Sequence, residues 1–251
     1  MSLSSKILVK TEDCSQGSAS LHMHSTKNIR IEPNRKSRLV FLTEPAGLAV
    51  EQYKLLRRRL NARSPLGGVL LVTSPGPGEG KTLTSVNLAW CMANGGHNTC
   101  LVDLDFRAPG VGSALGYFPE NEGVEDVLIG KAKTADVLRQ IGEDPLYVLG
   151  MLEHHASPDG FLSATLVAPF VNELRNMFHW VILDLAPAIP MSDVAEVVPH
   201  VDGALLVVRE RKTKKKLIAP PCEILGSKLW GVVLNDSPIM GSAYYGGYGK
   251  K

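Results

Sequence analysis

A glycine-rich stretch at residues 70–82 has the composition of a phosphate-binding loop. It reads Leu-Leu-Val-Thr-Ser-Pro-Gly-Pro-Gly-Glu-Gly-Lys-Thr and ends in Lys81 and Thr82. Glycines let the backbone approach a ligand closely, and successive N–H groups before a helix N-terminus form a concavity for phosphate oxygens. We therefore expect Lys81 at the β- and γ-phosphates of a nucleotide and the Thr82 hydroxyl at Mg²⁺.

The loop departs from the strict pattern G-x-x-x-x-G-K-[ST]. Pro75 stands where the first glycine belongs, and Pro77 removes one N–H donor from the cradle. A simple Gly/Pro turn is the alternative interpretation of the stretch. The residues expected to contact the nucleotide are Gly76, Pro77, Gly78, Glu79, Gly80, Lys81, Thr82 and Leu83.

Three aspartates stand directly after or close behind apolar runs. Residues 98–102 lead into Asp103 and Asp105, and residues 180–183 lead into Asp184. In a doubly wound parallel sheet, polar residues just past the carboxyl ends of strands line the ligand crevice. Carboxylates beside a phosphate loop suit Mg²⁺ ligation or the acceptance of a proton, and the Asp184 segment has the Walker B arrangement.

Strands and helices alternate along the middle of the chain, which predicts a parallel α/β sheet. Strands are expected before the glycine-rich loop and at residues 98–102, 146–150, 180–184, 203–209 and 231–235. Helices are expected at residues 47–60, 81–94, 123–130, 161–178, 193–198 and 212–229, the last interrupted by Pro220-Pro221.

Both ends of the chain differ in composition from this middle part. Residues 1–38 are rich in polar residues and predict a flexible N-terminal arm, with one short extended piece at Ile7–Val9. Residues 39–238 form the predicted domain, and residues 239–251 a flexible, glycine-rich tail. The tail carries Tyr244, Tyr245 and Tyr248. Such a segment cannot bury aromatic rings, so its tyrosines would be accessible to a tyrosine-modifying active site.

Bulk composition excludes several classes of protein. The 251 residues are 44% hydrophobic and 21% charged, with a net charge of +2 that does not by itself imply nucleic acid as a partner. No apolar run approaches the ~18 residues that cross a bilayer, and no signal-peptide core is present. The four cysteines form no C-x-x-C pair, so neither zinc nor a disulfide framework is indicated. We expect a cytoplasmic protein.

Taken together, these motifs resemble the bacterial tyrosine kinases of capsule and exopolysaccharide synthesis. Residues 77–82 (Pro-Gly-Glu-Gly-Lys-Thr) match that family's form of Walker A. Residues 101–107 (Leu-Val-Asp-Leu-Asp-Phe-Arg) match its Walker A′ motif, and residues 181–187 (Val-Ile-Leu-Asp-Leu-Ala-Pro) match its Walker B motif. The terminal tyrosines match its autophosphorylated cluster. The resemblance runs from about Glu44 to the C-terminus and implies a P-loop NTPase fold of the MinD/ParA type used as a kinase.

The resemblance also implies roles for individual residues. Lys81 would stabilise the transferring phosphoryl group of ATP, and Thr82, Asp105 and Asp184 would organise Mg²⁺. Asp103 is the candidate for accepting the tyrosine proton, with a metal role as the alternative. Positioning and charge neutralisation would supply most of the rate enhancement.

Further residues receive roles from the same resemblance. Arg107 would orient the A′ loop, and Asn235 would contact adenine. The family's E-x-x-R-x-x-R helix, which mediates head-to-tail ring assembly, corresponds here to Glu51, Lys54 and Arg57. Lysine replaces the first arginine, and a point charge substitutes poorly for a bidentate fork.

The resemblance to separately encoded cytoplasmic kinases implies a transmembrane, chain-length-determinant-like activator that recruits the chain to the inner face of the membrane. Two other functions stay open at this point. One is a MinD/ParA-like ATPase switch, disfavoured because residues 74–76 read Ser-Pro-Gly and lack that group's additional lysine. The other is a kinase-like regulator with little catalysis of its own, disfavoured by the tyrosine tail.

Overall fold

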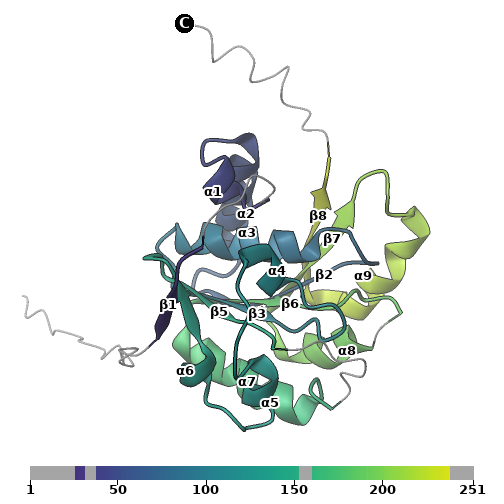
Figure 1. Cartoon of the computed structure of the whole chain (residues 1–251). Coiled ribbons are helices and arrows are strands. Elements are labelled where there is room, and N and C mark those ends of the chain that lie inside the picture. Colours follow the sequence, from purple (N-terminus) through teal and green to yellow (C-terminus); the bar gives the residue numbers. More distant parts are fainter. Residues whose placement is uncertain (1–25, 32–37, 153–159, 191, 238–251) are drawn as a thin grey trace, which may run out of the picture.

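The computed structural model describes residues 26–31, 38–152, 160–190 and 192–237. Within these ranges eight strands form one sheet (Figure 1). Its order is β1 (Lys27–Ile29), β4 (Arg139–Ile141), β5 (Leu146–Leu149), β3 (Thr99–Asp103), β6 (Trp180–Asp184), β2 (Gly68–Thr73), β7 (Gly203–Arg209) and β8 (Leu229–Asn235). All neighbours pair in parallel except β4 with β5, which are antiparallel.

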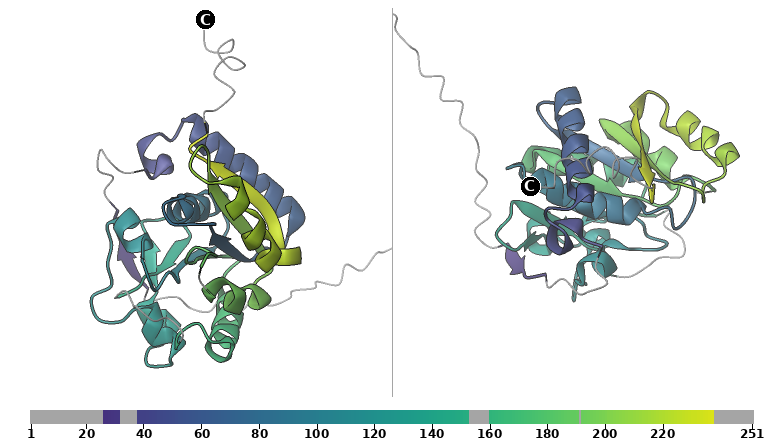
Figure 2. Two further views of the ribbon diagram at one scale, coloured as in Figure 1. Left: turned by 90° about the vertical axis from the view of Figure 1, so that its right-hand side faces the viewer. Right: turned by 90° about the horizontal axis from the view of Figure 1, so that it is seen from above.

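Helices cover both faces of the sheet (Figures 1 and 2). One face packs against α1 (Val40–Thr43), α2 (Leu48–Arg63), α3 (Lys81–Ala93) and α4 (Val111–Leu115). The other packs against α5 (Val124–Leu128), α6 (Thr134–Val137), α7 (Ala164–Met177), α8 (Asp193–Val197) and α9 (Ala219–Leu225). The central strands β3 and β6 are buried along their whole length, which is why they read as continuous apolar runs. The doubly wound parallel architecture is confirmed.

Five short elements escaped the sequence prediction: β1, β4, α1, α4 and α6. The strand β1 lies inside the expected arm and pairs with β4, and α1 precedes the helix expected at residue 47. These pieces have three to five residues each, too few for a periodic pattern to show. The expected extended piece at Ile7–Val9 and the tail at residues 239–251 lie outside the described residues, so the domain boundaries remain a prediction.

The expectation that Pro220-Pro221 interrupts a helix is wrong. The two prolines stand in the first turn of α9, where no intrahelical N–H bond is lost and the fixed φ of proline suits the helix. A separate turn of 3₁₀-helix, Lys215–Leu217, precedes them. No helix within the described ranges has the length and apolar character that crossing a bilayer requires.

Candidate active site

The predicted aspartates meet where the central strands end. β3 pairs with β6 so that Asp103 and Asp184 stand side by side, and β6 pairs with β2 so that Val72 aligns with Asp184. The loop from β2 to α3 therefore begins at the edge of the sheet that carries the carboxylates. Parallel pairing brings these three motifs together although they lie far apart in the sequence.

Lys81, the first residue of α3, points its ammonium at two of these carboxylates. Its Nζ lies 2.6 Å from Asp105 Oδ2 and 3.5 Å from Asp184 Oδ2. The lysine side chain is only 10% exposed, and both carboxylates are buried. One cation thus neutralises charge at the ends of two adjacent strands.

Two hydroxyl groups orient the Asp184 carboxylate. Thr82 Oγ1 donates to Oδ2 at 2.7 Å, and Ser85 Oγ donates to Oδ1 at 2.9 Å. Sequence reasoning identified Thr82 but missed Ser85. The signal was present, because Ser85 follows Lys81 by four residues and so lies on the same face of α3.

The charged groups in this cluster shift one another's pKa values. Burial alone would lower the pKa of the Lys81 ammonium, but the negative charges of Asp184, Asp105 and Asp103 outweigh burial and raise this pKa. Lys81 is therefore protonated at neutral pH. Burial raises the pKa of the Asp184 carboxyl, and the neighbouring ammonium and hydroxyl donors oppose that rise.

The Asp103 carboxylate is bound by the backbone of the loop that follows β3. Its carboxylate is fully buried, and Oδ2 accepts hydrogen bonds from the backbone N–H groups of Gly110 and Val111 at 3.0 and 2.9 Å. Oδ1 accepts from the Asp105 N–H at 3.2 Å. Burial, with the charge of Asp184, raises the Asp103 pKa to about 7. These contacts hold the loop after β3, and the expected role of Asp103 as proton acceptor remains a prediction.

Arg107, on the same loop, forms an ion pair with Asp193. Its Nε and Nη2 donate to Oδ2 and Oδ1 of Asp193 at 3.2 and 3.4 Å. Asp193 is the first residue of α8 and is buried. This contact ties the loop after β3 to the connection that follows β6.

The glycine-rich loop has the backbone that a phosphate cradle requires. Gly78 and Gly80 have φ of +71° and +93°, in the left-handed region that favours glycine. A Cβ on Gly80 would lie 2.0 Å from Asn235 Nδ2, so a side chain has no room there. The N-terminus of α3 has no side-chain cap within the described residues, so its N–H groups can bind an anion.

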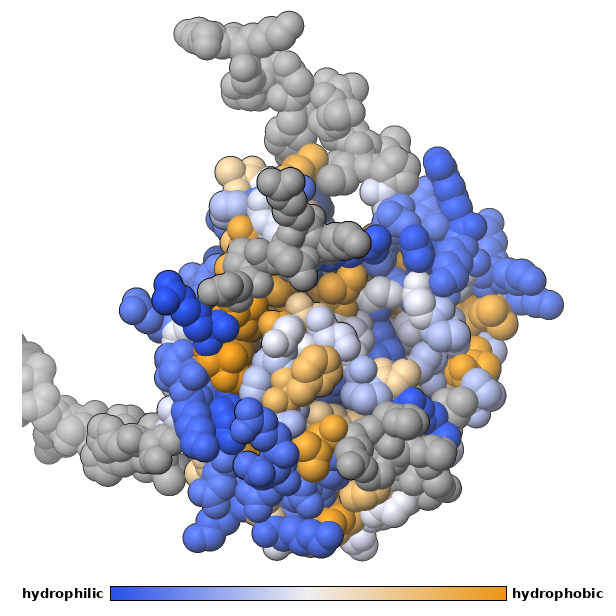
Figure 3. Space-filling model, in the orientation of Figure 1, coloured by the Kyte–Doolittle hydropathy of each residue, from blue (hydrophilic) through white to orange (hydrophobic). Residues whose placement is uncertain are grey.

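Glu79, which was expected to contact the nucleotide, makes its observed side-chain contacts within the chain. Its buried carboxylate faces the β7–α9 connection, where Oε2 accepts hydrogen bonds from the Arg209 N–H at 2.8 Å and from the Thr213 hydroxyl. Lys212 Nζ donates to the carbonyl of Gly78 at 3.1 Å. The connection projects as a hydrophilic ridge beside α9 (Figure 3). These contacts span over 130 residues of sequence, so no local pattern signals them.

Two cavities flank the glycine-rich loop. The first, of about 430 Å³, is lined by Pro77, Gly78, Gly80, Lys81, Thr82, Leu83, Asp105, Arg107, Ala108, Ala186, Pro187, Ile189 and Pro190. The second, of about 650 Å³, includes Asn235 and shares Gly78, Gly80 and Leu83 with the first. Neither Gly76 nor Glu79 contributes to either lining. A nucleotide lying across the loop would place its phosphates in the first cavity and its nucleoside in the second.

The donor set fits Mg²⁺ as well. Thr82, Asp105 and Asp184 offer a hydroxyl and two carboxylates, the hard oxygen ligands that Mg²⁺ prefers, with room for phosphate oxygens. Among the described residues no cluster of three or more His, Cys, Asp or Glu side chains forms a metal site by itself. A site completed by substrate phosphates is the usual arrangement for this ion.

The predicted assembly helix is α2, and its three residues make contacts within the chain. Lys54 Nζ pairs with Glu51 Oε1 at 2.7 Å on the exposed surface. Arg57 Nη1 donates to the carbonyl of Cys91, near the end of α3, at 2.6 Å. The expected acceptors Tyr244, Tyr245 and Tyr248 lie outside the described residues.

Comparison with known proteins agrees with this geometry. The chain is 32% identical over 232 residues to the tyrosine-protein kinase YwqD of Bacillus subtilis, a match that covers 88% of this chain and 97% of the relative. The chain belongs to the bacterial tyrosine kinases. This kinase is also 29% identical over 177 residues to the succinoglycan biosynthesis transport protein ExoP of Rhizobium meliloti, covering 68% of the kinase and 22% of ExoP.

Solved structures support both family and fold. The kinase domain of the Escherichia coli tyrosine kinase ETK matches with a TM-score of 0.72 at 26% identity, covering 86% of this kinase and 83% of that chain. MinD of Pyrococcus horikoshii, complexed with Mg-ADP, matches with a TM-score of 0.55 at 21% identity, over 66% and 69% of the two chains. The second likeness shows the fold alone. No family model matches the chain. The predictions of a MinD-type P-loop fold and of a protein-tyrosine kinase are confirmed.

Proposed function

We propose that this kinase transfers the γ-phosphoryl group of ATP to tyrosines of its own C-terminal segment and thereby regulates the polymerisation and export of an exopolysaccharide. The observation that carries the transfer is the Lys81 ammonium, held by Asp105 and Asp184 beside Thr82 at the phosphate cavity. The link to polysaccharide rests on the match to ExoP, whose name assigns it to succinoglycan biosynthesis.

In the proposed reaction the phenolic oxygen of a tyrosine attacks the γ-phosphorus of ATP. The bond from that phosphorus to the β–γ bridging oxygen breaks, ADP leaves, and the phenolic proton passes to a carboxylate. We assign the proton to Asp105, because its carboxylate lines the cavity and Asp103 does not. Lys81 stabilises the charge on the transferring group, and the loop N–H groups orient the phosphates.

Thr82 and Asp184 are the residues we assign to Mg²⁺, which when bound would neutralise charge on the phosphates. The sequence analysis also placed Asp105 among the metal ligands. An experiment can separate this role from that of proton acceptor. Asp105→Asn should lower kcat with an unchanged Mg²⁺ requirement if Asp105 accepts the proton. A marked rise in the Mg²⁺ concentration for half-maximal activity would instead make it a ligand.

The nucleoside of ATP is assigned to the second cavity, where Asn235 is held against the loop. Its Nδ2 donates to the Glu79 carbonyl at 2.8 Å, which leaves Oδ1 to accept from a base or sugar donor. Asn235→Ala should weaken ATP binding by loosening the loop and removing this acceptor. An unchanged Kd for ATP would contradict the assignment.

The first experiment is incubation of the full chain with ATP and Mg²⁺, with and without the cytoplasmic segment of a candidate activator, followed by intact mass. Phosphate additions that map to Tyr244, Tyr245 or Tyr248 are the expected result. ADP release without mass gain would favour an ATPase switch. Phosphorylation mainly on Tyr53 or Tyr147 would overturn the assignment of the tail.

We further propose that a transmembrane, chain-length-determinant-like protein activates the kinase and recruits it to the inner face of the membrane. Head-to-tail self-assembly through Glu51, Lys54 and Arg57 would bring the tail of one subunit to a neighbour's site. Exposure of the Glu51 side chain, at 59%, supports its availability for such an interface. Light scattering with and without ATP tests the assembly.

A further inference from the structure

A run of basic residues leaves the sheet where β7 ends. Residues 210–216 read Glu-Arg-Lys-Thr-Lys-Lys-Lys, so five cations and one acid give this run a net charge of +4. The whole chain has a net charge of +2, which leaves −2 for all the other residues. Positive charge is therefore concentrated in one place, on the hydrophilic ridge beside α9 (Figure 3). We call residues 210–216 the basic ridge.

Most cations of the basic ridge have no firm partner within the protein. The lysines at 214–216 are exposed and take part in no ion pair among the described residues. The Arg211 side chain is 80% exposed and lies 3.8 Å from Glu210, a long contact. Lys212 is the exception, because its Nζ donates to the carbonyl of Gly78. Three lysines and Arg211 are thus free to meet an external anionic surface.

The segment that follows the basic ridge exposes apolar side chains. Leu217 and Ile224 are 37% and 38% exposed. With Pro220 they recur at intervals of three and four residues, which places them along one side of a helical segment. The other side of α9 packs into the core through Pro221 and Leu225. An exposed apolar stripe therefore begins directly after the last lysine of the ridge.

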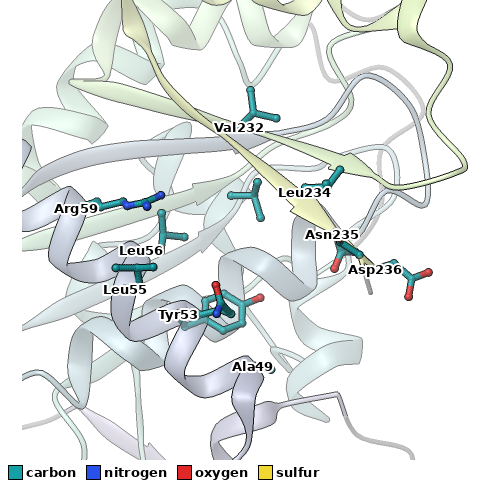
Figure 4. Close-up of a pocket in the computed structure, with 12 residues that line it drawn as sticks. Ala49, Tyr53, Leu55, Leu56, Arg59, Val232, Leu234, Asn235 and Asp236 are labelled. Carbon is teal, nitrogen blue, oxygen red and sulfur yellow. The ribbon is translucent and has the colours of Figure 1, made fainter. Parts of the chain in front are cut away.

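The edge strand β8 adds apolar surface on the same side of the sheet. Val232 and Leu234 are 53% and 54% exposed, a high exposure for aliphatic side chains. They pair in register with Leu206 and Val208 of β7, which belong to the core on the α9 side of the sheet. Figure 4 accordingly shows Val232 on the side of β8 that is turned away from α2. Charge and exposed apolar side chains thus share one side of the molecule.

We propose that this side of the kinase, formed by the basic ridge and the exposed apolar side chains of α9 and β8, binds directly to a bilayer of anionic lipids. Clusters of about four to eight Lys and Arg residues attract anionic headgroups, and neighbouring apolar side chains enter the interfacial layer. The ridge projects from the surface, as Figure 3 shows, so it fits a flat bilayer better than it would enclose a peptide.

The proposed membrane surface adjoins the phosphate loop. The backbone N–H of Arg209, where β7 ends, donates to Glu79 of that loop at 2.8 Å. Lys212, within the ridge, holds the carbonyl of Gly78. A kinase bound through the ridge therefore keeps its nucleotide site close to the bilayer. This contact is additional to the proposed recruitment by a transmembrane activator, and it requires neither that partner nor kinase activity.

Cosedimentation of the full, unphosphorylated, nucleotide-free chain with lipid vesicles tests the proposal. The wild type should bind vesicles of phosphatidylglycerol and phosphatidylcholine in equal parts and should not bind pure phosphatidylcholine. A triple variant should bind the anionic vesicles at least about tenfold more weakly. It carries Lys214→Glu, Lys215→Glu and Lys216→Glu. Absence of binding by the wild type would overturn the proposal.

A second triple variant is the matched control, because it changes the net charge equally at exposed lysines elsewhere. It carries Lys27→Glu, Lys131→Glu and Lys133→Glu. Lys27 lies on β1, at the opposite edge of the sheet, roughly 30 Å from β8 at about 4.8 Å per strand. That distance exceeds the screening length, so this variant should bind within about twofold of the wild type. Equal losses in both triple variants would refute a role for the ridge.

Two further measurements test the apolar part and the nature of the partner. Val232→Ser combined with Leu234→Ser should weaken binding by about tenfold and leave its salt dependence unchanged, because less apolar area is buried at the same charge. Unweakened binding would refute insertion of these side chains. Capture of soluble poly-glutamate without any vesicle binding would mean that an acidic protein segment is the partner, which also overturns the proposal. The vesicles contain no activator and the assay no ATP, so these outcomes are independent of the proposed transfer reaction.

Discussion

The Lys81 ammonium lies 2.6 Å from the Asp105 carboxylate, and both side chains are almost completely buried. Asp105 belongs to the loop after β3, and Lys81 begins the helix after β2. This contact therefore joins the two motifs on which phosphoryl transfer depends. The charge of the carboxylates is therefore partly compensated before a nucleotide arrives, and part of the cost of gathering charged groups is met during folding.

Replacement of Lys81 by methionine should abolish phosphotyrosine formation. It should also destabilise the fold by about 3 kcal/mol near pH 8, because Asp105 and Asp184 keep buried charges without a partner. The loss should shrink as pH falls, because burial raises the pKa of the Asp184 carboxyl and protonation removes its charge. Urea denaturation near pH 8 and at lower pH measures it. Lys214→Met, at an exposed lysine, is the control and should retain activity and stability. Persistent phosphotyrosine in Lys81→Met would contradict the role of the loop.

Substitution of the loop glycines should have position-specific effects. Gly80→Ala should weaken ATP binding at least tenfold, because its Cβ would lie 2.0 Å from Asn235 Nδ2 and its φ is +93°. Gly76→Ala is the matched control, since the nearest atom to its Cβ would be Glu79 Oε1 at 3.9 Å. Calorimetric titration with ATP compares them, and equal Kd values for both variants would refute the steric argument.

Asp103 should make stability depend on pH with a defined sign. Its folded-state pKa of about 7 exceeds the ordinary value near 3.9, so between these pH values the folded chain binds a proton that the unfolded chain has lost. The free energy of unfolding therefore decreases as pH rises from 4 to 7, by up to about 1.4 kcal/mol per unit. Asp103→Asn lacks this titration, so its stability should fall less over that range. If the free energy of unfolding of the two proteins had the same pH dependence from pH 4 to 7, a folded-state pKa of about 7 for Asp103 would be contradicted.

Substitutions at the two ends of the assembly motif in α2 should have different effects on the stability of the monomer. Arg57→Ala removes the hydrogen bond to the Cys91 carbonyl and should cost the monomer about 1–2 kcal/mol. Glu51→Ala touches only the exposed pair with Lys54 and should leave monomer stability unchanged. A reduced oligomer mass in Glu51→Ala, measured by light scattering, would therefore report the interface alone. An unchanged mass would argue against assembly through this helix.

The sequence predicts the centre of this molecule far better than its edges. β3 and β6 are buried on both faces, so their residues had to be apolar, and the aspartates that end them are visible as a break in that pattern. β1 has only three residues and pairs with β4 alone, across more than a hundred residues of sequence. A signal of that kind is carried by the tertiary structure, so no short window contains it.

The candidate site was likewise predicted only in part. Lys81, Thr82, Asp105 and Asp184 were assigned from motifs; the first three line one cavity, and the buried Asp184 contacts Lys81 and Thr82. The D-x-D motif places two carboxylates close together but does not indicate which of them accepts hydrogen bonds from the backbone that follows. The orientation of Asp103 therefore could not be predicted from its position. The sequence did not predict the hydrogen-bond partners of Glu79 for a related reason, since Thr213 approaches Glu79 only after the sheet has formed.

The end of β8 is tied directly to the phosphate loop. Asn235 donates to the Glu79 carbonyl, and Arg209 holds Asp236 while also reaching the Gly78 carbonyl. Among the described residues only Ser237 follows them. A displacement of that segment would therefore act on the phosphate loop as well as on β7, with which Asn235 is paired.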